Sequence, residues 1–443
     1  MASKRKRRVL PSAAVRATIE ALTHDGRGIA RVEGKPVFIH GTLPGEDISF
    51  VYTDIRRDYA EGKLDELHSS APGRVEPRCP SYGVCGGCSF QHVADATQIE
   101  LKQALLVEQF SRIGKIGELA LAPPLTGPSW GYRHKARLGV KYVAKKGRVL
   151  VGFRERSSPF VADLESCPVL HPSVGERLQD LSDLIRGLSV RDRLPQIEVA
   201  VSDDRVALVF RILQDQTEDD QQRLSEFGRN FGFDIYVQRH GPDSVTSVFP
   251  EDPERLRYAL PAEGVEFRFK PTDFTQVNIE INRQMVRRVI EWLDPQVGDR
   301  ILDLFCGIGN FTLPLAKRTG HVVGVEGGQE AVERANENAA LAELQNVEFH
   351  VADLTQSLEG RSWAEGRYDK ILLDPSRAGA EEVLAGISGW QPSRIVYVSC
   401  NPSTLARDAG ILVHEHGYRL IRAGVMDMFP QTAHVESIAM FEK

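Results

Sequence analysis

The sequence has no long hydrophobic run. No stretch of about 18 consecutive apolar residues occurs in its 443 residues, which argues against a transmembrane helix. The basic residues near the N-terminus are not followed by an apolar segment, so a secretory signal is not predicted either. We therefore expect a cytoplasmic protein that has no membrane partner.

Cysteine is scarce as well, at six residues. In a chain with no predicted export signal, cysteines are expected as thiols or metal ligands rather than disulfides. Cys79, Cys85 and Cys88 fall within ten residues, with glycines between them that let the backbone approach a metal centre. A closed site needs a fourth ligand, for which Cys167 is the candidate. These donors leave zinc and an iron–sulfur cluster both open, and unrelated free thiols are the alternative.

Basic residues are concentrated in two segments, although the net charge is −6. Lys4–Arg8 is an uninterrupted basic block, and the segment from Gly131 to Arg156 holds nine Lys or Arg residues against one acid, Glu155. Such a stripe suits a polyanion, because each neutralised phosphate releases counterions. The alternative for the block is a solubilising tail. The alternative for the segment from Gly131 to Arg156, called the basic stripe below, is a merely solvated face.

The chain is longer than one hydrophobic core usually organises, so several domains are expected. We predict a basic tail over residues 1–11, an all-β unit over 12–70, a β-rich central domain over 71–270 and an α/β domain over 271–443. In the all-β unit, alternating runs such as Ile48–Tyr52 are separated by turns rich in Gly, Pro and Asp. This unit resembles a TRAM domain, a small barrel-like RNA-binding module, and an unrelated packing barrel is the alternative.

The central domain is predicted from paired strand patterns. Leu138–Val143 is followed by a Lys-Lys-Gly turn and a second apolar run, and Ile197–Val201 and Val206–Phe210 flank an Asp-Asp turn. A helix is expected before them, from about Gln98 to Ile113. We assign the metal-binding cysteines and the basic stripe to this domain.

The last third of the chain alternates between strands and helices. Apolar strands are predicted at residues 300–305, 322–326, 347–351, 370–374 and 394–399. A helix is expected before them, from about Asn282 to Leu293. This βαβ alternation is typical of a doubly wound parallel sheet, as in a Rossmann-like domain.

The first of these strands runs into the bend Cys306-Gly307-Ile308-Gly309-Asn310, where glycines let the backbone approach a ligand. Glu326 ends the next strand, where a carboxylate can bind two ribose hydroxyls. Asp353 follows the third strand, within reach of an adenine edge. The dinucleotide fingerprint is absent, because no glycine follows Gly309 three residues later. The bend resembles the first motif of S-adenosylmethionine-dependent methyltransferases, which favours that cofactor over NAD.

Cys400 follows an apolar strand that ends at Pro402, which has no amide hydrogen to give a sheet. Side chains at this end of a parallel sheet line the ligand crevice, so Cys400 is a candidate nucleophile, with a buried structural cysteine as the alternative. A cysteine and a carboxylate beside a methyl donor suggest methylation of uracil at C5. A thiolate that adds to uracil C6 activates C5 toward a methyl sulfonium, and a base then removes the C5 proton. Glu436 is the candidate base, with a surface residue as the alternative. Asp374 follows the preceding strand, with a helix cap as the alternative.

Together these motifs resemble the RNA uracil-C5 methyltransferase family over essentially the whole chain. The resemblance implies that Cys400 is the nucleophile and Glu436 the general base. It implies cofactor and substrate contacts from Gln276, Phe305, Asn310, Glu326, Asp353 and Asp374. Relatives can carry Asn at the position of Asp353, so its contact is the least secure. The resemblance also implies that Cys79, Cys85, Cys88 and Cys167 bind a [4Fe-4S] cluster.

A TRAM unit combined with a cluster resembles the branch of the family that acts on large-subunit ribosomal RNA. We therefore expect a monomeric enzyme that methylates a uridine of 23S ribosomal RNA. A tRNA uracil-C5 methyltransferase and a noncatalytic RNA-binding iron–sulfur protein are the alternatives. The Pro-Cys motif of DNA cytosine methyltransferases is absent from the sequence.

Overall fold

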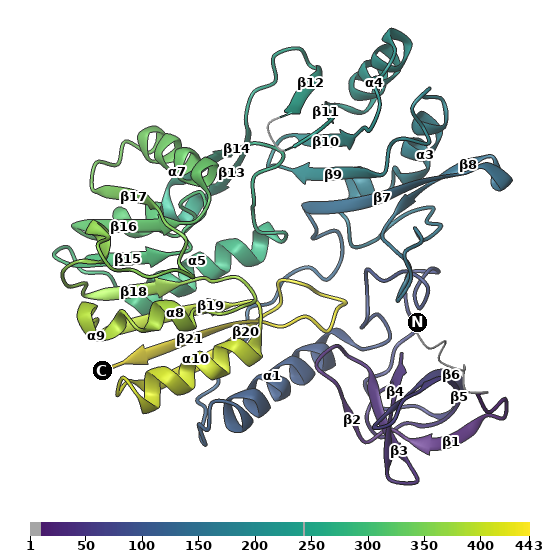
Figure 1. Ribbon diagram of the computed structural model, residues 1–443, viewed down its shortest axis with the longest axis horizontal. Coiled ribbons are helices and arrows are strands. Elements are labelled where there is room, and N and C mark those ends of the chain that lie inside the picture. Colours follow the sequence, from purple (N-terminus) through teal and green to yellow (C-terminus); the bar gives the residue numbers. More distant parts are fainter. Residues whose placement is uncertain (1–9, 242–243) are drawn as a thin grey trace, which may run out of the picture. The chain divides into compact units, whose positions relative to one another are not determined.

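The computed structural model describes residues 10–241 and 244–443 (Figure 1). The basic block Lys4–Arg8, and with it most of the predicted tail, lies outside the described residues. The chain divides into two compact units, each made of several segments of the sequence. The first takes the chain up to Leu101 and adds Arg154–Ala162 and Phe429–His434. The second holds Lys102–Phe153, Asp163–Met428 and Val435–Lys443.

The first unit is built on a six-stranded sheet. In pairing order its strands are β1 (Val15–Thr18), β5 (Asp47–Ile55), β6 (Ala60–Ser69), β4 (Lys35–His40), β3 (Gly28–Val32) and β2 (Ala21–Leu22). Successive side chains alternate between the two faces, and Val37, Ile39, Ile48 and Phe50 are fully buried on the inner face. The all-β character predicted for this region is confirmed.

A smaller apolar cluster joins this sheet to the segments that complete the first unit. It contains Leu43, Phe90, Val93 and Ala433. Gly26, in the turn between β2 and β3, has a φ of +81°, and a Cβ there would lie 2.6 Å from Phe90 and 2.8 Å from Ala433. Glycine is therefore required at this turn by both the backbone and the packing.

The second unit contains a mixed six-stranded sheet. In pairing order its strands are β12 (Val245–Phe249), β11 (Phe233–Gln238), β10 (Val206–Arg211), β9 (Gln196–Val201), β7 (Lys135–Val143) and β8 (Arg148–Gly152). Helix α3 (Leu178–Arg186) packs against β8, and α4 (Glu218–Phe231) packs against β11 and β12. The predicted hairpins correspond to β7–β8 and β9–β10.

A separate hairpin, β13 (Leu256–Leu260) with β14 (Val265–Phe269), precedes helix α5 (Ile279–Leu293). Asn278 caps α5, because its side chain accepts a hydrogen bond from the amide of Ile281 at 3.3 Å. The helix thus begins three residues before the expected Asn282, at a polar residue that satisfies an end amide.

The final sheet has seven strands. In pairing order these are β17 (Val347–Val351), β16 (His321–Glu326), β15 (Arg300–Leu304), β18 (Lys370–Leu373), β19 (Arg394–Ser399), β21 (Glu436–Glu442) and β20 (Arg419–Met426). Strands β15 to β19 are parallel, whereas β21 runs antiparallel to both β19 and β20. The sheet is therefore mixed rather than wholly parallel. The connection between β20 and β21, residues 427–435, is too short for a parallel crossover.

Helices cover the faces of this sheet, which is drawn in green and yellow in Figure 1. They are α1 (Asp95–Arg112), α5, α6 (Thr312–Ala316), α7 (Gln329–Leu341), α8 (Glu381–Leu384), α9 (Ile387–Trp390) and α10 (Pro402–His414). The central strands are apolar on both faces, as with the consecutive residues Ile301 and Leu302 of β15 and Val322 and Val323 of β16, which are fully buried. No helix in the described part of the chain is long and apolar enough to cross a lipid bilayer.

Candidate active site

The carboxyl ends of β15, β16, β18 and β19 meet at one edge of the final sheet, because these strands are neighbours and parallel. The residues that follow or end them there are Phe305, Glu326, Asp374 and Cys400. Ligands of open α/β sheets bind outside this edge. The structure therefore brings these four predicted site residues to one edge of the sheet.

The bend after β15 is shaped by residues with positive φ. Phe305 has a φ of +67°, Gly307 of +55° and Gly309 of +89°. The amides of Gly307 and Gly328 donate to the two carboxylate oxygens of Glu326, at 3.1 Å and 3.0 Å. These bonds fix the carboxylate of Glu326 at the end of β16, and each oxygen keeps a lone pair for a ligand hydroxyl.

Asp303 lies inside β15 and is fully buried beneath the bend. Thr312 Oγ1 donates to its Oδ2 at 2.6 Å, and its Oδ1 has no hydrogen-bond partner among the residues that the structure describes. Burial raises the pKa of Asp303 to about 7, and the charge of Glu326 adds to the rise. Asp303 was not among the predicted site residues, although an acid within an apolar strand is a signal for a functional role.

Asn310 is the last residue of the bend, and hydrogen bonds hold its side chain in place. Its Oδ1 accepts from the Tyr258 hydroxyl at 2.9 Å and from Asn282 Nδ2 at 3.0 Å, and its Nδ2 donates to Asn282 Oδ1 at 3.0 Å. Gln276 lines a small pocket beside these groups. The pocket is bounded by His134, Val201, Asp203, Tyr258, Phe269, Thr275, Gln276, Ile279 and Asn282. Tyr258 and Asn282 were not among the predicted site residues.

Cys400 and Glu436 are placed by strand register. Ser399 of β19 is directly opposite Ser437 of β21, so Cys400 follows the end of β19 where Glu436 begins β21. Glu436 is 5% exposed, which excludes the surface alternative, and Cys400 is half-buried. The pKa of the Cys400 thiol is raised to about 11 by burial and by the charges of Glu436 and Asp374, against the opposing effect of Arg377.

Asp374 completes this acidic group. Burial raises its pKa well above the usual range of a carboxyl group, and the charges of Glu436, Asp303 and Glu326 act in the same direction. The loop after β18 is tied to the loop after β19, because Asn401 Nδ2 donates to the carbonyl of Arg377 at 3.1 Å. Asn401 also caps α10 by accepting from the amide of Ser403.

Asp353 lies at the same edge of the sheet, beyond the end of the strand that pairs in parallel with β16. It follows β17, the edge strand, and is exposed. Its Oδ1 accepts from both the amide and the hydroxyl of Thr355, at 3.0 Å and 2.7 Å. A cofactor contact through Asp353 stays a prediction.

The cysteines proposed as metal ligands belong to both units. Cys79, Cys85 and Cys88 lie in the first unit, and Cys167 lies in the second. All except Cys79 are buried, and none of the six cysteines forms a disulfide. Burial raises the pKa of Cys85, and the neighbouring Cys79 adds to this rise. Over residues 10–241 and 244–443, no three His, Cys, Asp or Glu side chains are grouped so that they could hold a metal ion.

Part of the basic stripe supports the fold. Lys135 donates to the carbonyl of Pro271 at 2.6 Å, and burial lowers its pKa to about 8. Lys146 and Arg148 pair with Asp163 at 3.3 Å and 2.9 Å. The exposed members on β7 and the turn after it are Arg137, Lys141, Lys145 and Lys146. The stripe lies on a folded surface as expected, and its contact with nucleic acid stays a prediction.

Comparison with known proteins identifies two families along this chain. Residues 188–443 match the tRNA (uracil-5-)-methyltransferase family, and residues 10–64 match the TRAM domain. A protein of Methylococcus capsulatus, named 23S rRNA (uracil(1939)-C(5))-methyltransferase, is 59% identical over the whole of both chains. One of Alkalilimnicola ehrlichii with the same name is 54% identical over 99% of both.

A solved structure supports the same assignment. The tRNA (uracil-54, C5)-methyltransferase of Pyrococcus abyssi, in complex with S-adenosyl-L-homocysteine, is 26% identical with a TM-score of 0.74. The match covers 96% of this chain and 99% of that one. The family match covers more than half of the sequence and includes the bend after β15, Cys400 and Glu436. The chain belongs to the tRNA (uracil-5-)-methyltransferase family.

Proposed function

We propose that this protein methylates carbon 5 of a uridine in 23S ribosomal RNA, with S-adenosylmethionine as the methyl donor. The observation that carries the chemistry is the placement of Cys400 beside Glu436 at the ligand edge of the sheet. The choice of RNA rests on the full-length relatives, which carry the name of a 23S rRNA enzyme. The choice of cofactor rests on the family and on the bound S-adenosyl-L-homocysteine of the archaeal relative.

The described residues fit this cofactor. A Cβ built at Gly307 meets no atom within 4 Å, so the backbone of the bend is open to a ligand. Glu326 would bind the ribose hydroxyls, and Phe305, Asn310, Asp374 and Gln276 would hold the remainder, with Asp353 as the expected adenine contact. S-adenosylmethionine supplies an electrophilic methyl group when it is bound.

The chain's own residues make the uracil reactive. The Cys400 thiol loses its proton to solvent and its sulfur forms a bond to C6, which places electron density on C5. C5 then takes up the methyl group, which leaves S-adenosylhomocysteine as the second product, and C5 carries both the methyl group and its original hydrogen. Glu436 accepts that hydrogen as a proton, the C5–C6 double bond re-forms and the bond from C6 to sulfur breaks, which releases the thiolate.

The electrostatics of the site favour a protonated resting thiol. With a pKa of about 11, about one Cys400 in a thousand is ionised at pH 8. The resting thiol is therefore mostly protonated, and it has to lose its proton for the sulfur to add to C6. A uracil inside a stacked helix cannot reach the sulfur, so the target nucleotide has to be extruded or presented in a loop.

A trapping experiment tests this function. A 23S rRNA fragment that carries 5-fluorouridine at the target position lacks the removable C5 proton, so methylation should stop at the covalent adduct. We expect an RNA–protein adduct that maps to Cys400 by mass spectrometry and is absent from Cys400→Ala. Cys306→Ala, which removes the buried thiol of the bend after β15, should still form the adduct. No adduct, or one on another residue, would refute the mechanism.

The alternatives for the substrate are separated by a second assay. Purified protein is offered a 23S rRNA fragment and an unmodified tRNA in parallel, and 5-methyluridine is mapped by sequencing. Methylation of the 23S fragment alone supports the proposal, whereas methylation of tRNA replaces it with the activity named for the archaeal relative. Binding of either RNA without methylation would support a noncatalytic RNA-binding protein.

We also propose that Cys79, Cys85, Cys88 and Cys167 bind a [4Fe-4S] cluster. The support is the donor set itself, thiols on a short glycine-containing loop with Cys85 and Cys88 buried. Thiolate coordination would offset the cost of ionising such buried thiols. Iron, sulfide and zinc analysis of anaerobically purified protein should give iron and sulfide, lost in Cys85→Ser. Zinc without sulfide, or no metal, would contradict the proposal.

The remaining expectations concern the state of the protein in the cell. We propose a monomer in the cytoplasm with ribosomal RNA as its partner and no membrane association. Light scattering of the purified protein should return the mass of one chain, 49.3 kDa. A mass of two chains would contradict the monomer.

A further inference from the structure

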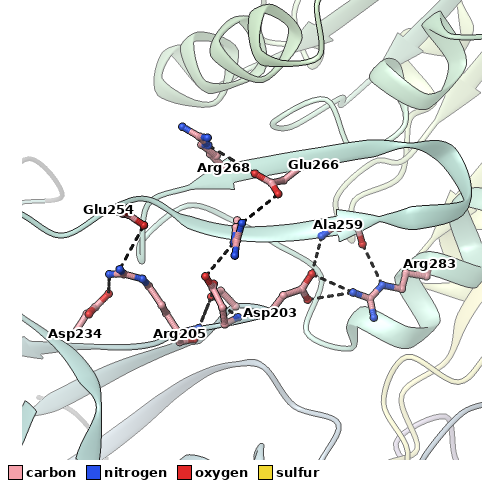
Figure 2. Close-up of polar contacts among 11 residues, drawn as sticks. Asp203, Arg205, Asp234, Glu254, Ala259, Glu266, Arg268 and Arg283 are labelled. Atoms are coloured by element: carbon pink, nitrogen blue, oxygen red, sulfur yellow. Dashed lines mark hydrogen bonds and ion pairs between the residues drawn. The ribbon is translucent and has the colours of Figure 1, made fainter.

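Asp203 lies in the turn between β9 and β10, and its carboxylate joins that turn to two other elements (Figure 2). Arg283 Nη2, from α5, donates to Asp203 Oδ1 and Oδ2 at 3.1 Å and 3.2 Å. The amide of Ala259, from β13, donates to Oδ2 at 2.8 Å. Arg283 Nε closes the set by donating to the carbonyl of Ala259 at 3.1 Å.

The residues just before Ala259 and Arg283 hold the bend after β15. Tyr258 precedes Ala259, and Asn282 precedes Arg283. Both donate to Oδ1 of Asn310, at 2.9 Å and 3.0 Å, and together they occupy the two lone pairs of that oxygen. One carboxylate thus organises both segments whose side chains fix the carboxamide of Asn310.

The contacts to Asn310 are protected from water. Asn282 is 1% exposed, and Tyr258 is 5% exposed and stacks on Phe267 with ring centroids 4.9 Å apart. Buried polar groups require partners, so a shift of either segment would leave one of these groups unsatisfied. The position of Asn310 is therefore coupled to the position of β13 and of α5.

The other ion pairs of the same network do not join both β13 and α5 to the turn between β9 and β10. Asp204, next to Asp203, accepts from Arg257 Nε at 2.9 Å, and the Arg257 side chain is 50% exposed. Figure 2 shows the further pairs of Arg205 with Asp234 and Glu254, and of Arg268 with Glu266. An exposed pair such as that of Arg257 with Asp204 contributes little. Arg257 precedes Tyr258, but the Asp204 pair holds only one of the two segments that contact Asn310, whereas the Asp203 carboxylate holds both.

We propose that Asp203 is a positioning residue for the cofactor loop and acts on Asn310 through Ala259–Tyr258 and Arg283–Asn282. The proposal rests on the proposed function, in which Asn310 contacts S-adenosylmethionine. Loss of the carboxylate charge would loosen both segments and weaken cofactor binding. It would leave the covalent step at Cys400 intact once the cofactor is bound.

The test compares Asp203→Asn with its neighbour Asp204→Asn in the full-length protein. Binding of S-adenosylhomocysteine, measured by calorimetry without RNA, should weaken about tenfold in Asp203→Asn and less than about twofold in Asp204→Asn. With RNA, KM for S-adenosylmethionine should rise by the same factor while kcat stays within about twofold. A wild-type affinity in Asp203→Asn, or equal loss in both variants, would overturn the proposal.

Tyr258→Phe provides a second route in case Asp203→Asn does not fold. It removes one of the two donors to Asn310, and we expect a several-fold loss of affinity for S-adenosylhomocysteine. In the double variant the two losses should be less than additive, since both act on the same carboxamide. Strict additivity would contradict the coupling. If wild-type protein binds S-adenosylhomocysteine but methylates no 23S fragment, the proposed function fails while this inference is still decided by the binding data.

Discussion

Cys400 and Glu436 lie at adjoining ends of two antiparallel strands, one step beyond the directly opposed pair Ser399 and Ser437. This register places the candidate nucleophile next to the candidate base without any long loop between them. Burial raises the pKa of Cys400, and the charge of the neighbouring Glu436 acts in the same direction, so both favour the protonated thiol. Addition and proton removal therefore depend on one strand pairing.

Replacing the base should separate the two halves of the reaction. In Glu436→Gln, Cys400 can still add to the uracil and C5 can still be methylated, but the C5 proton has no acceptor. We expect turnover to fall by about 10²- to 10⁴-fold, with an RNA–protein adduct accumulating on natural substrate. Denaturing gel electrophoresis with labelled RNA measures the adduct. Full turnover in this variant would remove Glu436 from the mechanism.

The ionisation of Cys400 should be visible in its rate of alkylation. Because its pKa is about 11, the rate with iodoacetamide should rise about tenfold per pH unit between pH 7 and 9, with no plateau. Glu436→Gln removes a negative neighbour and should speed alkylation at pH 8. Peptide mass spectrometry follows Cys400 separately from the other cysteines. A plateau near pH 8 would show that the thiolate forms more readily than proposed.

The buried carboxyl group of Asp303 should make folding stability depend on pH. Its pKa is raised from 3.8 to about 7 in the folded state, so the folded state favours the protonated form. Stability from this group is present below about pH 4 and is lost as the pH rises through 7. At about 1.4 kcal/mol per unit, the loss is about 4 kcal/mol.

Asp303→Asn provides the comparison for that effect. The amide keeps an oxygen for the Thr312 hydroxyl but does not ionise. We expect the difference in free energy of unfolding between this variant and the wild type to shift in favour of the variant from pH 4 to pH 8, as measured by urea denaturation. A difference that does not vary with pH would show that Asp303 is ionised throughout.

Two glycines of the first unit allow packing to be separated from backbone strain. Gly26 and Gly34 have φ values of +81° and +79°, but a Cβ at Gly34 meets nothing within 4 Å, whereas one at Gly26 would lie 2.6 Å from Phe90. Gly34→Ala should cost about 1–2 kcal/mol from strain alone. Gly26→Ala should cost about 1–3 kcal/mol more, because Phe90 and Ala433 have to move. Equal thermal shifts would contradict this.

Local patterns in the sequence predicted the elements that carry them. The strands at 300–305 and 394–399 and the all-β region were recognisable, because alternation and apolar runs are properties of neighbouring residues. The hairpin β13–β14 was not predicted, nor was the antiparallel placement of β21 between β19 and β20. Strand order depends on which edges meet in three dimensions, and the sequence period does not contain that information.

The site residues also divide into those that a local pattern predicts and those that depend on distant partners. Cys400, Glu326 and Asp374 were predicted because each follows or ends a strand of the α/β pattern. Asp203 was not predicted, because its partners Ala259 and Arg283 lie 56 and 80 residues away in the sequence. Such a contact exists only after the sheet, the hairpin and the helix have packed.

The composition of the first unit limits how this protein can be dissected. Its segments come from the beginning, the middle and nearly the end of the chain, with Phe429–His434 contributed from the connection that leads into Glu436. A fragment that stops after Leu101 would leave Phe90 without its packing partner Ala433. A fragment that starts at Lys102 would contain Phe429–His434 without the rest of the first unit. Gene-truncation studies that assume consecutive, separable modules should therefore yield insoluble pieces, and point substitutions are the appropriate way to study either half.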